Sequence, residues 1–174
     1  AGERAKGDGG AAVLRGRHRT ALRRAAAADG RGSAGGLAAL DRPQPRVELG
    51  LALRGVASAA IDVSDGLLAD VGHILERSGL AADLDFERLP RAALEACADA
   101  ALARNALLAG GDDYELAFTA PPARRRDIEA LSAKLGLPLA RIGSLRDGPA
   151  GEIVLRDAAG NPMPVGRRGF DHFA

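Results

Sequence analysis

Hydrophobic and polar residues recur along this chain with two spacings, one typical of helices and one typical of strands. Residues 66–78 predict the clearest helix, and Gly79 lies where a glycine commonly ends one. The predicted apolar face carries Leu67, Leu68, Val71, Ile74 and Leu75. The opposite face is expected to carry Asp70, His73, Glu76 and Arg77. This helix should therefore pack its leucine-rich side on a hydrophobic core.

From residue 42 onward the pattern predicts strands and helices in alternation. Strands are expected over residues 57–62, 80–86, 114–119, 139–143 and 152–156. Further helices are expected over residues 47–56, 91–103 and 121–135. Such alternation indicates a sheet with helices packed on it. We therefore expect an α+β fold, an α/β sandwich with a mixed sheet.

The first 41 residues have a different texture. They are rich in alanine, glycine and arginine, and their one helical stretch, residues 11–28, has a thin apolar face. The turn signal at Pro43 and Pro45 follows this segment. We therefore interpret residues 1–41 as an appendage and residues 42–174 as the folded domain.

Composition narrows the classes of function. The 174 residues, 47% of them hydrophobic, suffice for one globular domain plus an appendage. No stretch reaches the roughly 18 apolar residues of a membrane span, and the start is too polar for a signal peptide. With a single cysteine, Cys97, and a net charge of +1, the sequence predicts a soluble cytoplasmic protein without general affinity for nucleic acid or membranes.

The first motif that suggests chemistry, Asp62-Val63-Ser64-Asp65-Gly66, connects a predicted strand to the clearest helix. The plainest interpretation is a helix cap, in which Ser64 or Asp65 accepts backbone N–H bonds. A cap needs only one such side chain, however, and Asp62 is a surplus carboxylate at a strand end. Magnesium is a suitable partner, because it takes one or two carboxylates and completes its coordination with water and phosphate oxygens.

The second motif, residues 110–116, concentrates three acidic residues and the chain's only tyrosine behind two glycines. It could be an ordinary turn, or the glycines could let the backbone approach a ligand closely. Three acids within four residues repel one another unless a cation or an outward arrangement relieves them. Each motif alone is compatible with a purely structural role.

Four motifs in order resemble those of thiamine-monophosphate kinases. They are Arg42-Pro43-Gln44-Pro45-Arg46, Ile61 to Leu67 with Asp70, Gly72 and His73, Gly110 to Leu116, and Gly169-Phe170-Asp171-His172-Phe173. The resemblance covers roughly residues 42–174. It implies the fold of the C-terminal domain of this family, which belongs to the ATP-dependent aminoimidazole ribonucleotide synthetase superfamily.

The resemblance implies a kinase that transfers the ATP γ-phosphate to thiamine monophosphate and yields thiamine diphosphate. Asp62 and Asp65 would hold Mg²⁺, and Ser64 would contact ATP. Asp112 would contact the thiamine substrate, and Phe170 would pack beside it. No catalytic base is identified, because a phosphate monoester with a second pKa of about 6 is already largely ionised at neutral pH. Catalysis then consists of holding two polyanions in line and offsetting their repulsion.

Members of this family carry an additional N-terminal domain that supplies much of the ATP site and the dimer contact. That domain has no counterpart in this sequence, although Gly7 to Leu14 faintly resembles the segment that opens the family's C-terminal domain. The 174-residue chain is therefore expected to be a fragment or a natural truncation. It is expected to have little kinase activity alone and to lack the N-terminal contact of a family homodimer.

Three alternative functions compete with the kinase. One is another enzyme of the same superfamily, such as aminoimidazole ribonucleotide synthetase or a hydrogenase-maturation protein. The second is a non-catalytic module that binds thiamine phosphates. The third is binding of RNA or another polyanion by the arginine-rich run 15–24, which the lack of interleaved aromatic residues disfavours. Gly30 to Gly35 spells G-x-G-x-x-G, but no predicted strand precedes it.

Overall fold

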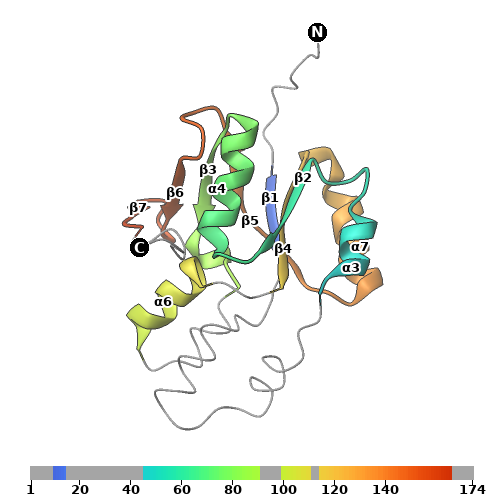
Figure 1. Ribbon diagram of the computed structural model, residues 1–174, viewed down its shortest axis with the longest axis horizontal. Helices are drawn as coiled ribbons and strands as arrows, with labels where there is room; N and C mark the ends of the chain where they lie inside the picture. The colour runs from blue at the N-terminus through green and yellow to red at the C-terminus, as the bar shows by residue number, and fades with distance from the viewer. Residues whose placement is uncertain (1–9, 15–44, 91–98, 111–113, 166–174) are drawn as a thin grey trace.

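Seven strands form one sheet across the residues that the computed structural model describes, 10–14, 45–90, 99–110 and 114–165. The strands are β1 (Gly10–Leu14), β2 (Ala59–Val63), β3 (Ala81–Asp85), β4 (Glu115–Ala120), β5 (Leu139–Arg146), β6 (Ile153–Arg156) and β7 (Pro162–Met163). Their order is β2-β4-β1-β5-β3-β6-β7 (Figure 1). Neighbouring strands run antiparallel, except that β3 and β6 are parallel. The sheet is therefore mixed, as the sequence predicts.

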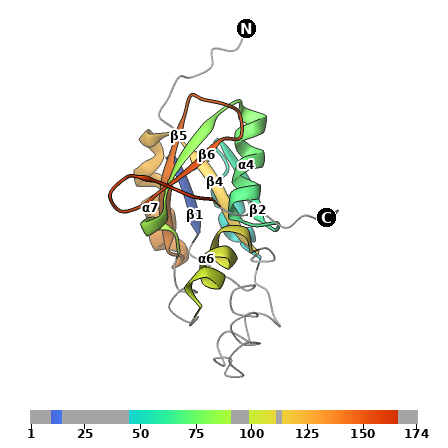
Figure 2. The ribbon, with the colours of Figure 1, turned by 90° about the vertical axis from the view of Figure 1, so that its left-hand side faces the viewer.

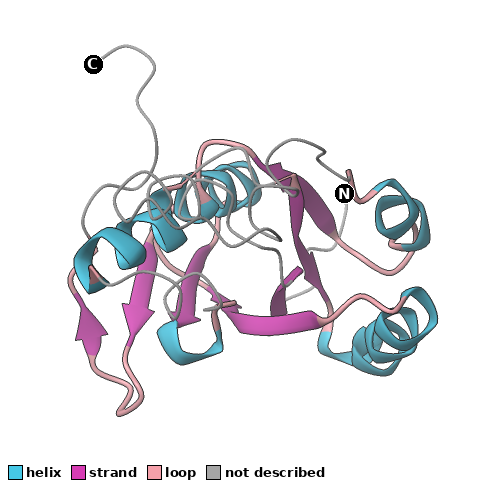
Figure 3. Ribbon diagram, turned by 90° about the horizontal axis from the view of Figure 1, so that it is seen from below, coloured by secondary structure: helices cyan, strands magenta, loops and turns pink. Residues whose placement is uncertain are grey.

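Helices cover both faces of this sheet. They are α3 (Val47–Ala52), α4 (Leu67–Ser78), α6 (Ala100–Ala109) and α7 (Arg125–Leu135), with short 3-10 turns η1 (Phe86–Arg88) and η2 (Pro122–Arg124). Figure 2 shows α7 and α4 on opposite sides of the strands, and Figure 3 shows helices outside the sheet on both sides. None of the described helices has the length and apolar character of a membrane span. The arrangement confirms the predicted α+β sandwich.

Two hydrophobic clusters hold the layers together. The larger cluster lies between the sheet and helices α4 and α6. To it α4 contributes the greater part of its predicted apolar face, namely Leu67, Leu68, Val71 and Leu75. The smaller cluster lies on the other face, where Leu49 and Leu53 at α3 meet Phe118 of β4 under α7. Burial of such side chains contributes ~1.5–3 kcal/mol each.

Helix boundaries follow local capping. Helix α4 ends at Gly79, whose φ of 67° is left-handed, as predicted. The helix expected over residues 91–103 has different bounds in the described part of the chain. Asp99 accepts two N–H bonds from the first turn of α6 and so caps a helix that continues to Ala109. Residues 91–98 lie outside the described residues.

Strand β1 lies in the middle of the sheet, between β4 and β5. It pairs with both, so that Gly10 lies opposite Ala120 of β4 and Leu14 lies opposite Leu139 of β5. The helix predicted in this segment is therefore wrong for residues 11–14. Two ladders of backbone hydrogen bonds satisfy the strand on both sides, and such tertiary pairing outweighs the weak helical preference of the local sequence.

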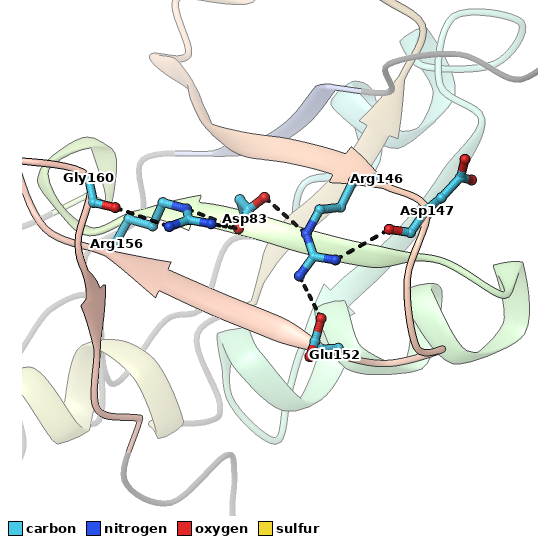
Figure 4. Close-up of polar contacts among 6 residues, drawn as sticks. All are labelled: Asp83, Arg146, Asp147, Glu152, Arg156 and Gly160. Carbon is cyan, nitrogen blue, oxygen red and sulfur yellow. Dashed lines mark hydrogen bonds and ion pairs between the residues drawn. The ribbon is translucent and has the colours of Figure 1, made fainter.

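A network of ion pairs joins strands β3, β5 and β6 (Figure 4). Asp83 accepts hydrogen bonds from Arg146 and Arg156, each at 3.0 Å, and Arg146 also donates to Glu152. Two carboxylates and two guanidinium groups leave this group of side chains electrically balanced. Its contacts therefore tie neighbouring strands together.

Candidate functional site

The candidate site begins where β2 ends. This strand brings Asp62 to the edge of the described sheet, and the chain then turns through residues 64–66 into α4. Gly66 has a φ of 122°, and a Cβ atom there would lie 2.8 Å from the backbone of Ala109 at the end of α6. Only glycine meets both demands. The end of α6 therefore packs directly on the turn between β2 and α4.

Asp70 organises this turn from within α4. The residue is buried, with 2% exposed, and its Oδ2 accepts N–H bonds from Ser64 at 2.9 Å, Asp65 at 3.1 Å and Gly66 at 3.2 Å. The prediction that Asp70 faces solvent is therefore wrong, because the N–H groups of the turn point back toward the first turn of the helix. Asp70 supplies an acceptor for the N–H groups of residues 64–66, a role for which the sequence suggested only Ser64 or Asp65 as capping residues.

Burial is the main influence on the pKa of the Asp70 carboxyl group. Removal from water raises the pKa of its carboxyl group above the ordinary value of 3.8, and the neighbouring charge of Asp65 also raises it. The N–H bonds from residues 64–66 lower the pKa and partly offset burial. Asp70 is thus committed to the turn, which leaves Asp62 and Asp65 as the carboxylates of this motif that lie nearer to solvent.

Asp62 and Asp65 fit part of a magnesium site. Asp62 is exposed, Asp65 is partly exposed, and the two lie three positions apart. Among the residues that the structure describes, no group of three or more His, Cys, Asp or Glu side chains could hold a metal ion. Magnesium accepts one or two carboxylates when phosphate oxygens and water supply its other ligands. The two aspartates therefore suit a metal that is shared with a bound phosphate.

A partly buried ion pair brings two further motifs to this turn. Arg46, just before α3, donates two hydrogen bonds to Glu115 at the start of β4, from Nε to Oε2 at 3.1 Å and from Nη2 to Oε1 at 2.8 Å. Glu115 is 6% exposed and lies opposite Val63 in the ladder between β2 and β4. Its hydrogen bonds raise the pKa of Arg46, so the guanidinium stays charged. The pair therefore fixes the start of α3 beside the end of β2.

Two unusual backbone positions flank the acidic part of the second motif. Gly110 packs so closely on Ala106 that a Cβ atom would overlap the Ala106 carbonyl group. Tyr114 has a φ of 55°, in the left-handed region that bulky residues rarely adopt, and it is 44% exposed. Such strain persists where the surrounding structure over-determines it, commonly at functional sites. Both flanks of residues 111–113 thus lie close to the turn between β2 and α4.

The residues predicted for the site divide into two groups. The structure holds Asp62, Ser64 and Asp65 at one turn, with Asp62 and Ser64 exposed. Asp112 and Phe170 lie outside the described residues, so their placement stays a prediction.

Sequence reasoning missed three positioning residues, Asp70, Arg46 and Glu115. All three occur in motifs that the sequence already singles out, and Arg46 and Glu115 carry opposite charges. That charge pairing between two motifs is the signal that could have identified Arg46 and Glu115, whereas Asp70 carries no such signal.

One family profile matches most of the chain. The family described as AIR synthase related protein, C-terminal domain, matches residues 4–156. The thiamine-monophosphate kinase of Salmonella typhimurium is 42% identical over 134 residues, which are 76% of this chain and 41% of the relative. The thiamine-monophosphate kinase of Haemophilus influenzae is 43% identical over 136 residues, with the same shares. The chain therefore spans only 41% of the length of these relatives.

Solved structures show the same fold. The thiamine-monophosphate kinase of Stenotrophomonas maltophilia K279a superposes with a TM-score of 0.76 and 38% identity, covering 92% of this chain and 53% of that one. AaThiL complexed with AMPPCP and TMP gives a TM-score of 0.72 at 24% identity, covering 97% of this chain and 52% of that one. At that identity the second likeness concerns the fold alone.

Proposed function

We propose that this chain, which belongs to the family described as AIR synthase related protein, C-terminal domain, is the C-terminal domain of a thiamine-monophosphate kinase. The proposed reaction transfers the γ-phosphate of ATP to thiamine monophosphate and yields thiamine diphosphate. The names of the related proteins from Salmonella and Haemophilus support this choice over other enzymes of the superfamily.

The observation that carries the proposal is the convergence of three separate motifs at one turn. The turn between β2 and α4 carries Asp62 and Asp65. Gly66 packs on the end of α6, which leads into the second motif. Arg46, from the first motif, donates two hydrogen bonds to Glu115 near the end of the second motif. Motifs 42–46, 61–67 and 110–116 thus support a single site.

Within this site the proposed roles follow the chemistry of each side chain. Asp62 and Asp65 would hold Mg²⁺, and Ser64 would contact ATP. Asp112 would contact thiamine monophosphate, and Phe170 would pack beside it. Bound magnesium would neutralise charge on the transferred phosphoryl group.

The chain's own contribution is positioning. Asp70 fixes the backbone that carries Ser64 and Asp65, through three N–H bonds. The acceptor phosphate needs no base, because its second pKa of about 6 leaves it largely ionised at neutral pH. Correct placement of two charged reactants then supplies most of the catalysis.

The related kinases are longer than the region that this chain matches, so we propose that a further domain takes part in the reaction. We take residues 42–174 as the main part of the domain, joined by β1 from the N-terminal segment. A further domain would complete the ATP site and the contact of a homodimer, so the 174-residue chain alone should show little turnover. We expect the enzyme to be soluble and cytoplasmic.

A chimera tests this function. The 174-residue chain would be fused behind the N-terminal part of the Salmonella relative, and thiamine diphosphate formation would be measured with ATP, thiamine monophosphate and Mg²⁺. Substitution Asp62→Asn should lower kcat by at least about 100-fold, since a lost electrostatic contact at a reacting group commonly costs that much. The control is Glu129→Gln, in an exposed ion pair on α7.

An active chimera that Asp62→Asn leaves unchanged would contradict the assigned role. A chimera without turnover would contradict the kinase. If the chain nevertheless binds thiamine monophosphate in calorimetry, the binding module is supported in its place.

A further inference from the structure

We propose that Asp70 is a specificity-determining residue. Its carboxylate fills an anion site formed by the N–H groups of residues 64–66, and so makes the turn between β2 and α4 select a divalent cation over a free phosphate. The use of that cation as magnesium shared with ATP rests on the proposed function. Asp70 acts through residues 64–66 and has no proposed contact of its own with metal or ATP.

The turn has the backbone geometry of a phosphate site. Three successive N–H groups, at the N-terminus of the 12-residue helix α4, point toward one place. Converging N–H groups at a helix N-terminus ordinarily bind anions, because their partial positive charges add to that of the helix dipole. An empty turn of this shape would therefore attract a phosphate oxygen.

A carboxylate of the chain already occupies this place. The Oδ2 atom of Asp70 accepts all three N–H bonds, at distances from 2.9 to 3.2 Å. Asp70 is only 2% exposed, so an anion from solvent cannot readily replace it. Hydrogen bonds to an ionised carboxylate are also stronger than those between neutral groups. The backbone of the turn is therefore committed to Asp70, and a nucleotide that contacts Ser64 has to use its side chain.

The charges at the turn favour a cation. Asp62 is exposed and Asp65 is partly exposed. The negative charge of Asp65 also acts on Asp70 and repels it. A divalent cation held by Asp62 and Asp65 offsets this repulsion, whereas a free phosphate adds to it. A phosphate should thus bind here only through a metal, which accepts carboxylate and phosphate oxygens together.

A purely structural cap makes a different prediction. If Asp70 only keeps the turn in shape, any side chain that accepts the same N–H bonds should serve equally well. Asp70→Asn keeps such an oxygen and removes the charge, so the affinity for a divalent cation should then stay unchanged. If the buried charge sets the preference, this variant weakens cation binding by about 10–100-fold, as changes in residues behind the metal ligands commonly do.

Two probes measure the preference of the turn in the 174-residue chain. Mn²⁺ suits the same oxygen ligands as Mg²⁺, and electron paramagnetic resonance follows its binding. Inorganic phosphate is added in the absence of metal, and the NMR shifts of the N–H groups of residues 64–66 report its binding. We expect the wild-type chain to bind Mn²⁺ and to show no phosphate-dependent shift at these residues.

Two variants and a control complete the experiment. Asp70→Ala empties the anion site, so it should gain phosphate-dependent shifts at residues 64–66 and lose Mn²⁺ affinity by about tenfold or more. Asp70→Asn should lose Mn²⁺ affinity without gaining phosphate binding, because its amide oxygen still accepts the N–H bonds. This milder variant keeps the test decisive if the alanine variant fails to fold. The control Glu129→Gln alters an exposed pair on α7 and should change neither affinity.

Wild-type Mn²⁺ affinity in the asparagine variant would overturn the proposal. So would phosphate-dependent shifts at residues 64–66 of the wild-type chain, because the N–H groups would then be open to an external anion. If the wild-type chain binds no Mn²⁺, the magnesium role in the proposed function fails for this chain. In that case phosphate binding gained by Asp70→Ala still supports the filled anion site, and its absence in the folded variant overturns it.

Discussion

Substitution Asp70→Ala should lower the free energy of unfolding far more than a typical substitution on α4 does. Asp70 is the acceptor for three N–H groups of the turn, and alanine leaves all three without it. The Gly66 N–H bond is buried, whereas those of Ser64 and Asp65 are partly buried, so water can satisfy only the latter two.

The magnitude follows from these differences in burial. A buried N–H group left without an acceptor costs ~1–3 kcal/mol, and each partly buried bond contributes about 0.5–1.5 kcal/mol. Loss of a carboxyl group that burial disfavours returns part of this cost. We expect a net loss of about 3 kcal/mol, which corresponds to about 6–12 °C in the melting temperature of a domain of this size. Asp70→Asn keeps an acceptor oxygen of the same reach and should lose only about 1–1.5 kcal/mol.

Urea denaturation followed by circular dichroism measures these free energies of unfolding. The control is Asp127→Ala, which removes an exposed ion pair with Arg124 on α7 and should change stability by at most ~0.5 kcal/mol. If Asp70→Ala is as stable as the control, or if the asparagine variant loses as much stability as the alanine variant, Asp70 does not hold the turn through these hydrogen bonds.

Two further predictions concern other parts of the fold. Gly66→Ala should destabilise the protein by at least ~2 kcal/mol, because the added Cβ meets the backbone of Ala109 at a φ of 122°. Gly72→Ala meets nothing within 4 Å and should stabilise α4 by about 0.5–1 kcal/mol, so equal effects of the two substitutions in urea denaturation would contradict this account. The carboxyl group of Asp157, in the turn before β7, should show a pKa below 3.8 in an NMR titration. The largest cause is the hydrogen bond that its carboxylate accepts from the backbone N–H of Asn161. Because the pKa of Asp157 is lower in the folded than in the unfolded state, its ionised carboxylate stabilises the turn above pH 3.8, and this stabilisation is lost as the pH falls through the folded-state pKa. A titration midpoint at or above 3.8 would show that Asp157 does not accept these hydrogen bonds in solution.

The features that sequence predicts well are those with a local signal. The apolar spacing of residues 67–75 defines which face of α4 is buried, and Gly79 ends the helix with the expected backbone conformation. The acidic motif at Asp62 likewise falls at a strand end, because strand and turn residues adjoin there.

The features that sequence does not predict depend on distant partners or on the backbone path. Arg46 and Glu115 are 69 positions apart, so their pairing requires the sheet to exist first. Asp70 occupies a position that helical periodicity assigns to solvent. It is turned inward because the turn before the helix offers three N–H groups, which only the conformation of Gly66 places there.

The central place of β1 has a consequence for how the protein folds. This strand, the first of the described ones, pairs with two strands that lie more than 100 residues later, as in the pairs Gly10 with Ala120 and Leu14 with Leu139. Such non-local pairing slows folding, because a long loop must close before the contacts form. During synthesis β1 has to wait unpaired until both partners have left the ribosome. A chain that loses β1 would instead expose facing edges of β4 and β5, and open strand edges are where other chains attach and aggregation starts.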